Sequence, residues 1–72
     1  MDEVRSELVG SVWKILVAAG DTVEANAEIM ILESMKMEIP VSASRRGVIE
    51  SIEVAEGEAV DSGQLLVRIE AE

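Results

Sequence analysis

The most distinctive chemical group in the sequence is the ε-amine of Lys36, which stands between Met35 and Met37. The chain has only one other lysine, Lys14. A lysine amine in water is almost entirely protonated at pH 7, and the segment has no second cation to activate it as a Schiff-base nucleophile. We therefore expect a passive amine, which a separate enzyme acylates with an activated acid so that Lys36 carries a group on a long arm.

The rest of the chain has little equipment for catalysis. It contains no cysteine and no histidine, which removes disulfides, thiol nucleophiles, the usual zinc ligands and Ser-His-Asp chemistry. The acidic residues are spread along the sequence, and no pair stands out as an acid and base. The sequence predicts no catalytic residue and no metal site.

Charge and hydropathy limit the partners and the location. The formal net charge is -9, from 15 acidic against 6 basic residues, which argues against nucleic acid and anionic membranes and favours partners with basic docking surfaces. Self-repulsion predicts a monomer in isolation. No apolar run reaches the length of a signal peptide or of a membrane span, which takes about 18 residues. We expect a cytoplasmic protein in which residues 1–72 form a single domain.

Lys36 must be positioned by a β-hairpin. Residues 28–34 form an apolar run, and after the tip Met37, Ile39 and Val41 alternate with polar residues, which is typical of a half-buried strand. Pro40 predicts that this second strand lies at a sheet edge, because proline cannot donate to a strand ladder. A two-residue hairpin turn normally takes Asn-Gly, whose residues tolerate positive φ. The sequence has Met35-Lys36 there, and a broken local rule is expected at a functional site.

The remaining segments also predict strands. Residues 7–17, 48–54 and 65–69 are rich in β-branched or alternating apolar residues, with a short piece around Val60. Residues 22–27 read as a loop or a very short strand, with a helix over 23–30 as the competing interpretation. Residues 1–5 read as a short ordered lead-in or a frayed end. The predicted fold class is all-β.

A repeat of 37 residues relates the two halves of the sequence. Gly10 falls on Gly47 and Gly20 on Gly57, which predicts that these four glycines mark turns or positive φ. Two copies of about four short strands predict a flattened β-barrel or sandwich of two four-stranded antiparallel sheets with pseudo-twofold symmetry. Advancing Lys36 by the repeat passes the last residue, so its hairpin should lie at the end of the domain farthest from both termini.

The segment Glu33-Ser34-Met35-Lys36-Met37-Glu38 resembles the attachment motif of biotinyl domains, whose hallmark is Met-Lys-Met. The resemblance covers roughly residues 6–70. Gly20, 16 residues before Lys36, and Gly47, 11 residues after it, match the glycine spacing of the related lipoyl domains. The chain is similar to small free-standing biotin/lipoyl attachment proteins, which include biotin carboxyl carriers.

This resemblance implies a barrel-sandwich hybrid of eight strands, with biotin joined to Lys36 as an amide by a biotin protein ligase. The biotin would carry carboxyl groups between the biotin carboxylase and carboxyltransferase components of an acyl-CoA carboxylase. The chain would be a carrier and not an enzyme, because catalysis belongs to those partners. The residues implied in the turn and in recognition by the ligase are Glu33, Ser34, Met35, Met37 and Glu38.

Two other functions stay open. Ser34 stands where many biotinyl domains have alanine or valine, and Glu33 resembles the glutamate of lipoyl domains, so a lipoyl carrier or a dual acceptor of biotin and lipoate is the first alternative. Lipoyl domains usually have Asp before the lysine and Ala or Val after it, which argues against this. The second alternative is an unmodified protein-interaction module, for which Lys36 would be dispensable.

Overall fold

The structure is a computed structural model that describes residues 2 to 71. Within this range eight strands alternate with turns, and no helix forms, so the helix considered over residues 23–30 is wrong. Residues 28–34 form one of these strands, as expected. The strands are β1 (Asp2–Arg5), β2 (Gly10–Ile15), β3 (Thr22–Val23), β4 (Glu28–Ser34), β5 (Met37–Ser42), β6 (Gly47–Ile52), β7 (Ala59–Val60) and β8 (Leu65–Ala71).

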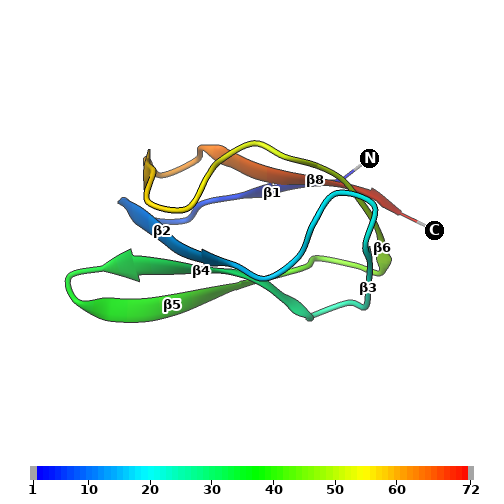
Figure 1. The fold of residues 1–72 in the computed structure, drawn as a ribbon, viewed down its shortest axis with the longest axis horizontal. Coiled ribbons are helices and arrows are strands. Elements are labelled where there is room, and N and C mark those ends of the chain that lie inside the picture. Colours follow the sequence, from blue (N-terminus) through cyan, green and yellow to red (C-terminus); the bar gives the residue numbers. More distant parts are fainter. Residues whose placement is uncertain (1, 72) are drawn as a thin grey trace.

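Two four-stranded antiparallel sheets pack face to face (Figure 1). One sheet has the strand order β1-β8-β6-β3 and the other has the order β5-β4-β2-β7. The domain is elongated, with extents of 35 × 17 × 17 Å. The predicted all-β sandwich is confirmed. No helix among the described residues is long and apolar enough to cross a membrane.

The pseudo-twofold is visible in the backbone. Advancing β2, β3 and β4 by 37 residues gives the bounds of β6, β7 and β8. The hydrogen bonds repeat as well: Gly20 N–H donates to the Ile49 carbonyl at 2.7 Å, and Gly57 N–H donates to the Val12 carbonyl at 2.7 Å. Each half therefore completes the other by the same contacts, as the sequence repeat predicts.

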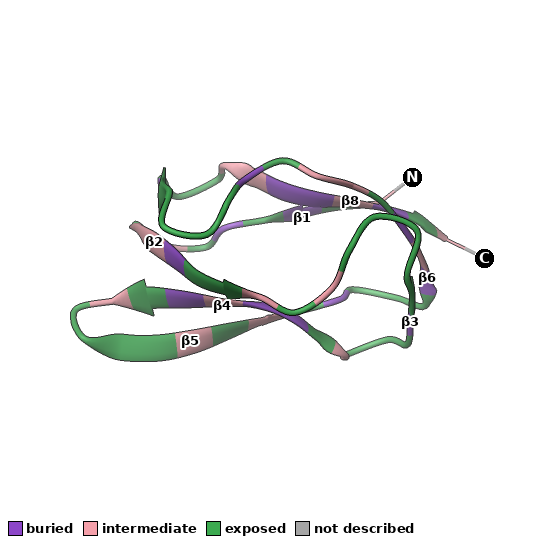
Figure 2. Ribbon diagram, viewed as in Figure 1, coloured by how far each residue is buried: buried purple, intermediate pink, exposed green. Residues whose placement is uncertain are grey.

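The hydrophobic core fills the space between the sheets (Figure 2). Strand residues supply most of it, and the alternation of inward and outward side chains is interrupted in β4 and β8, where the adjacent pairs Ile29-Met30 and Leu66-Val67 are both buried. Ser6 is the buried polar residue, and its hydroxyl donates to the Leu8 carbonyl at 2.6 Å. The buried apolar residues are Val4, Val12, Val23, Ile29, Met30, Leu32, Ala43, Ile49, Val54, Val60, Leu66, Val67 and Ile69.

The four repeated glycines serve two different purposes. Gly20 (φ 95°) and Gly57 (φ 89°) lie at turns with positive φ, as predicted. For Gly10 and Gly47 the prediction is wrong, because they begin β2 and β6 and have no positive φ. At these positions a Cβ atom would collide with the backbone carbonyl of a neighbouring strand. Close approach between strands, and not turn geometry, requires glycine there.

Over the described part of residues 1–5 the frayed end is wrong, and the ordered lead-in is a strand of the fold. Asp2–Arg5 forms β1 and pairs with β8 at the other end of the sequence, from Asp2 opposite Ile69 to Arg5 opposite Leu65. Val4 is buried in the core. Met1 lies outside the described residues. A long-range pairing of this kind leaves little signal in a four-residue segment.

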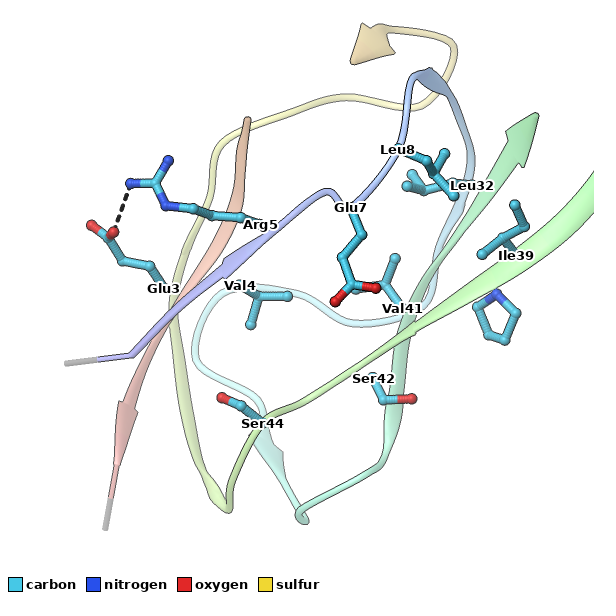
Figure 3. A pocket seen from close by; sticks show the side chains of 11 residues that line it. Glu3, Val4, Arg5, Glu7, Leu8, Leu32, Ile39, Val41, Ser42 and Ser44 are labelled. Carbon is cyan, nitrogen blue, oxygen red and sulfur yellow. Dashed lines mark hydrogen bonds and ion pairs between the residues drawn. The ribbon is translucent and has the colours of Figure 1, made fainter. Parts of the chain in front are cut away.

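Both sheets end in an edge strand on the same side, and these strands are β1 and β5. The edge position of Pro40 in β5 is confirmed by the strand order. A groove with a cavity volume of about 310 Å³ runs between the two edges (Figure 3), with a floor that includes Val4, Leu32 and Val41. An ion pair of 2.7 Å joins Asp2 of β1 to Arg45, which follows β5. The sandwich is open along this flank where the groove lies, and the ion pair links its two edges.

Candidate functional site

The tip of the β4–β5 hairpin has an unusual backbone. The ladder closes with Ser34 opposite Met37, which leaves Met35 and Lys36 as the two turn residues. Their φ angles are 52° and 66°. Positive φ at both positions is what a type I′ turn requires, and it costs a residue with a Cβ roughly 1–2 kcal/mol. The predicted two-residue turn without glycine is confirmed.

The tip is fully accessible. Met35 is 92% exposed and Met37 is 62% exposed, so neither methionine belongs to the core. Lys36 is exposed too, and no hydrogen bond or ion pair holds its side chain within the described part of the chain. The hairpin projects at the end of the long axis opposite both termini (Figure 1), as the repeat predicts. A second protein can therefore reach the amine from several directions.

Two contacts brace the hairpin, one from the residue before β2 and one from the first residue of β2. The Ser34 hydroxyl donates to the Val9 carbonyl at 3.0 Å. One residue further on, Gly10 allows the Glu33 carbonyl to approach closely. Val9 itself is 64% exposed. Sequence reasoning missed Val9, because nothing in its local pattern shows that it lies beside a strand more than twenty residues away.

Glu33 and Glu38 face each other across the hairpin. They occupy directly opposite positions on β4 and β5, one pair further from the tip than Ser34 and Met37. Both side chains are exposed, and no ion pair reaches either of them from the residues described. Like charges at such a position are destabilising. The root of the turn is therefore an acidic site without a compensating cation among residues 2–71.

The other lysine has a different environment. Lys14 lies on β2, and its Nζ atom stands 5.6 Å from the centroid of the Trp13 ring. This is a cation–π distance, at which the ring attracts the ammonium group. Lys36 lies on a turn and Lys14 in a sheet, so a modifying enzyme meets two very different lysines.

Lys36 lies outside the groove between β1 and β5. The groove in Figure 3 is lined by residues of β1, β5 and the segments beside them, and the turn residues Met35, Lys36 and Met37 do not line it. Across residues 2–71, no group of His, Cys, Asp or Glu side chains could hold a metal ion. The carboxyl with a clear pKa shift among these residues is Glu3, where the hydrogen bond from Arg5 lowers the pKa. This carboxyl belongs to β1 and not to the hairpin.

The structure brings the sequence-predicted residues together at one end of the molecule. Glu33, Ser34, Met35, Lys36, Met37 and Glu38 all lie in the tip of the hairpin or in the two residue pairs behind it. Gly10 packs behind the hairpin. Gly20, Gly47 and Gly57 shape other parts of the fold. The attachment role of Lys36 and the recognition roles of its neighbours remain predictions.

Comparison with known proteins gives a consistent family. The Biotin_lipoyl family, described as "Biotin-requiring enzyme", matches residues 3–69. A Biotin/lipoyl attachment protein of Bacillus subtilis is 42% identical over 66 residues, which span 92% of this chain and 90% of that protein. The chain is also 44% identical over 72 residues to the dihydrolipoyllysine-residue acetyltransferase component of the pyruvate dehydrogenase complex of Pseudomonas aeruginosa, of which it spans 13%.

A solved structure supports the same relationship. The urea carboxylase of Kluyveromyces lactis contains a region that superposes on 94% of this chain with a TM-score of 0.89 and 37% sequence identity. The matching region is 6% of that chain. Similarity thus extends both to a relative of similar length and to small parts of much larger chains.

Proposed function

The chain belongs to the biotin/lipoyl attachment family, and from this premise we propose that Lys36 is its attachment residue and biotin its cofactor. A biotin protein ligase would form the amide between the carboxyl group of biotin and the Lys36 ε-amine. The chain would then act as a carrier, in agreement with the family of carriers to which it is similar. It would itself catalyse no step.

One observation carries the proposal. The chain keeps Met35 and Lys36 at two positive-φ positions, although the turn would be more stable with residues such as Asn-Gly. The strained turn holds an exposed lysine at the tip of the β4–β5 hairpin. Strain of this kind, kept at one place by a well-packed scaffold, is typical of functional sites.

The environment of Lys36 fits a long, covalently held group. The amine is unpaired within the described residues and lies outside the groove, so nothing in the fold has to move for an amide to form. Bound biotin would supply the ability to carry a carboxyl group, and the chain supplies the root of the arm. Because β4 and β5 are held in a six-pair ladder, that root stays fixed while the arm moves.

The surrounding residues would serve recognition by the ligase. Met35 and Met37 offer two exposed apolar side chains on either side of the amine. Glu33 and Glu38 offer a pair of negative charges behind it. Ser34 fixes the hairpin through Val9. A ligase with an apolar cleft and basic residues at its mouth would match this arrangement.

The partners follow from the same proposal. A biotin carboxylase component would load the carboxyl group and a carboxyltransferase component would remove it, as in the acyl-CoA carboxylases. We assign both reactions to the cytoplasm, where ATP is available. Residues 1–72 would act as one monomeric attachment domain, consistent with the family match over residues 3–69.

Mass spectrometry after enzymatic modification tests this proposal. The purified chain is incubated with ATP, biotin and a biotin protein ligase, and the adduct is located by peptide mapping. We expect one biotin, less one water, on Lys36. The Lys36→Arg variant should remain unmodified, because arginine keeps the charge without an acylatable amine. The Lys14→Arg variant, changed at the other lysine, should be modified like the parent.

A lipoyl carrier is the second candidate function. The similarity to a dihydrolipoyllysine-residue acetyltransferase component favours it, and Met-Lys-Met argues against it. A parallel reaction with lipoate and a lipoyl ligase separates the two. Modification by lipoate alone would replace the biotin proposal, modification by both would show dual acceptance, and modification by neither would leave an interaction module.

A further inference from the structure

The two outer faces of the sandwich have the same backbone but opposite character. Each residue on the outer face of one sheet has a mate, 37 positions away, on the outer face of the other. Trp13 corresponds to Glu50, and Leu16 corresponds to Glu53. The irregularity in β2 between Val12 and Lys14 recurs in β6 between Ile49 and Ser51. The difference in side chains is therefore not imposed by the fold.

The face on the sheet of Lys36 is apolar at its centre. Ile31 lies directly opposite Pro40 on one side and Lys14 on the other, so the three side chains share the outer face. Trp13 lies beside Lys14 in the irregular part of β2 and is 42% exposed, and Leu16, just beyond β2, is 48% exposed. We define the apolar face by Trp13, Leu16, Ile31 and Pro40. Their mates on the other sheet are Glu50, Glu53, Arg68 and Glu3.

Acidic residues border the apolar face along the hairpin. Glu33 and Glu38 follow it towards the tip, and Glu28 lies towards the other end of β4, opposite Ser42. Lys14 is the only basic residue in the four strands of this sheet, and its ammonium group is held over the Trp13 ring. An apolar centre with a charged border resembles the core and rim of a protein interface.

The charge decides which occupant fits. A second copy of this chain would bring two acidic borders together, and each copy has a net charge of -9, so self-association through this face is disfavoured. A partner with an apolar patch bordered by Arg or Lys is complementary on both counts. A half-exposed tryptophan is also the type of residue that dominates binding energy at interfaces.

The position of the face relative to the tip indicates which partner it serves. Pro40 is four residues beyond Lys36, about 13 Å along an extended strand. A ligase must bring its active site to the Lys36 amine and so centres its contact on the turn. An enzyme that acts on the far end of the arm must instead bind the body of the domain, so that the arm can extend into its active site.

We propose that the apolar face is the docking surface for the biotin carboxylase component, which acts on the far end of the biotinylated arm, and that this component presents an apolar patch bordered by basic residues. The inference rests on the proposed function, because it assumes an arm on Lys36. It adds a surface on β2, β4 and β5 that is separate from the attachment turn. Docking of this kind lowers KM for the carrier without changing the chemistry at the head group.

The test exchanges side chains between the two faces. The double variant Trp13→Glu, Leu16→Glu copies Glu50 and Glu53 onto the apolar face, at backbone positions whose mates already carry glutamate. The matched control is Glu50→Gln, Glu53→Gln on the other face. Each chain is biotinylated on Lys36, and ADP release by the purified biotin carboxylase component of the same organism gives KM and kcat for the carrier. Thermal unfolding checks that each variant is folded.

We expect the double variant to raise KM at least tenfold with kcat within about twofold, while the control matches the parent. KM of the parent should rise with ionic strength, because salt screens the acidic border. The rate of biotinylation by the ligase should change less than twofold. An unchanged KM in a folded, biotinylated double variant would overturn the proposal, and so would a slower ligase reaction with normal KM. Failure of the parent to accept biotin on Lys36 would instead refute the proposed function.

Discussion

Glu33 and Glu38 lie directly opposite each other on β4 and β5, one pair behind the residues that close the turn of Lys36. The two carboxylates have no cationic partner in the described part of the chain. The repulsion between these two negative charges destabilises the hairpin slightly, and the pair creates a negative potential beside the lysine turn. Two features therefore lower the stability of the hairpin: the like-charge pair and the strained backbone of the turn.

Replacing one carboxylate by a cation should therefore stabilise the domain. Glu38→Lys creates an opposite-charge pair with Glu33, and we expect the free energy of unfolding to rise by about 0.2–1 kcal/mol. Urea unfolding measures this, and high salt should reduce the gain. Glu70→Lys changes a glutamate at the 37-residue mate of Glu33, opposite Val48 rather than an acid, and serves as the control. Equal effects of both variants would contradict the cross-strand repulsion.

Relieving the backbone strain should have a larger effect. Met35→Asn combined with Lys36→Gly installs the dipeptide that a type I′ turn prefers. We expect the free energy of unfolding to rise by about 1–3 kcal/mol, since two residues leave a strained conformation. Chemical denaturation of this variant, beside Lys36→Arg as a control that keeps the strain, measures the difference. A variant no more stable than the parent would show that the turn is not strained.

The methionines at the tip should be dispensable for folding. Met35→Leu combined with Met37→Leu conserves volume at two exposed positions, so the free energy of unfolding should change by less than about 1.5 kcal/mol, the usual limit even for buried swaps. The rate of modification by the ligase is expected to fall. Met30→Leu, at a buried methionine, is the comparison for a core position. Collapse of the exposed double variant in thermal unfolding would refute their placement outside the core.

Substitutions of the glycines should separate into two classes. Gly47→Ala puts a Cβ atom against the Glu70 carbonyl and the Ile69 side chain, so β6 and β8 must move apart. Gly57→Ala meets no atom within 4 Å and suffers only from its φ of 89°, which costs about 1–2 kcal/mol. Thermal unfolding should show the larger loss for Gly47→Ala. The reverse order would contradict the assignment of close strand contact to Gly47.

This order corrects an expectation drawn from the sequence. The sequence predicts turns or positive φ at Gly10, Gly20, Gly47 and Gly57, and it ranks Gly20→Val and Gly57→Val as the most destabilising glycine changes. Of these four glycines, Gly20 and Gly57 have a positive φ, and Gly10 and Gly47 do not. A repeat of glycines shows that a backbone constraint recurs, but it does not distinguish a turn from the close approach of a neighbouring carbonyl.

The sequence by itself determined the local geometry of the site and the symmetry of the fold. An apolar run predicted β4, and alternation of apolar residues predicted β5. Pro40 predicted an edge, and Met35-Lys36 between two strands predicted a strained turn. These features depend on residues that are neighbours in the chain, since side-chain period and φ preference act over a few residues. The 37-residue repeat extended the strand prediction to the whole domain, because two halves of similar sequence are expected to adopt the same backbone path.

Only the tertiary structure decided which distant residues share an edge or a face. Asp2–Arg5 forms β1 because it pairs with β8, and no local pattern in four residues encodes that partner. The shift of register at Trp13 interrupts the alternation in β2, so that Lys14 lies opposite Ile31 on the outer face while Ile15 turns back towards the core. Strand pairing is long-range and one residue of slip reverses every side chain, which is why the apolar face could not be predicted before the register was known.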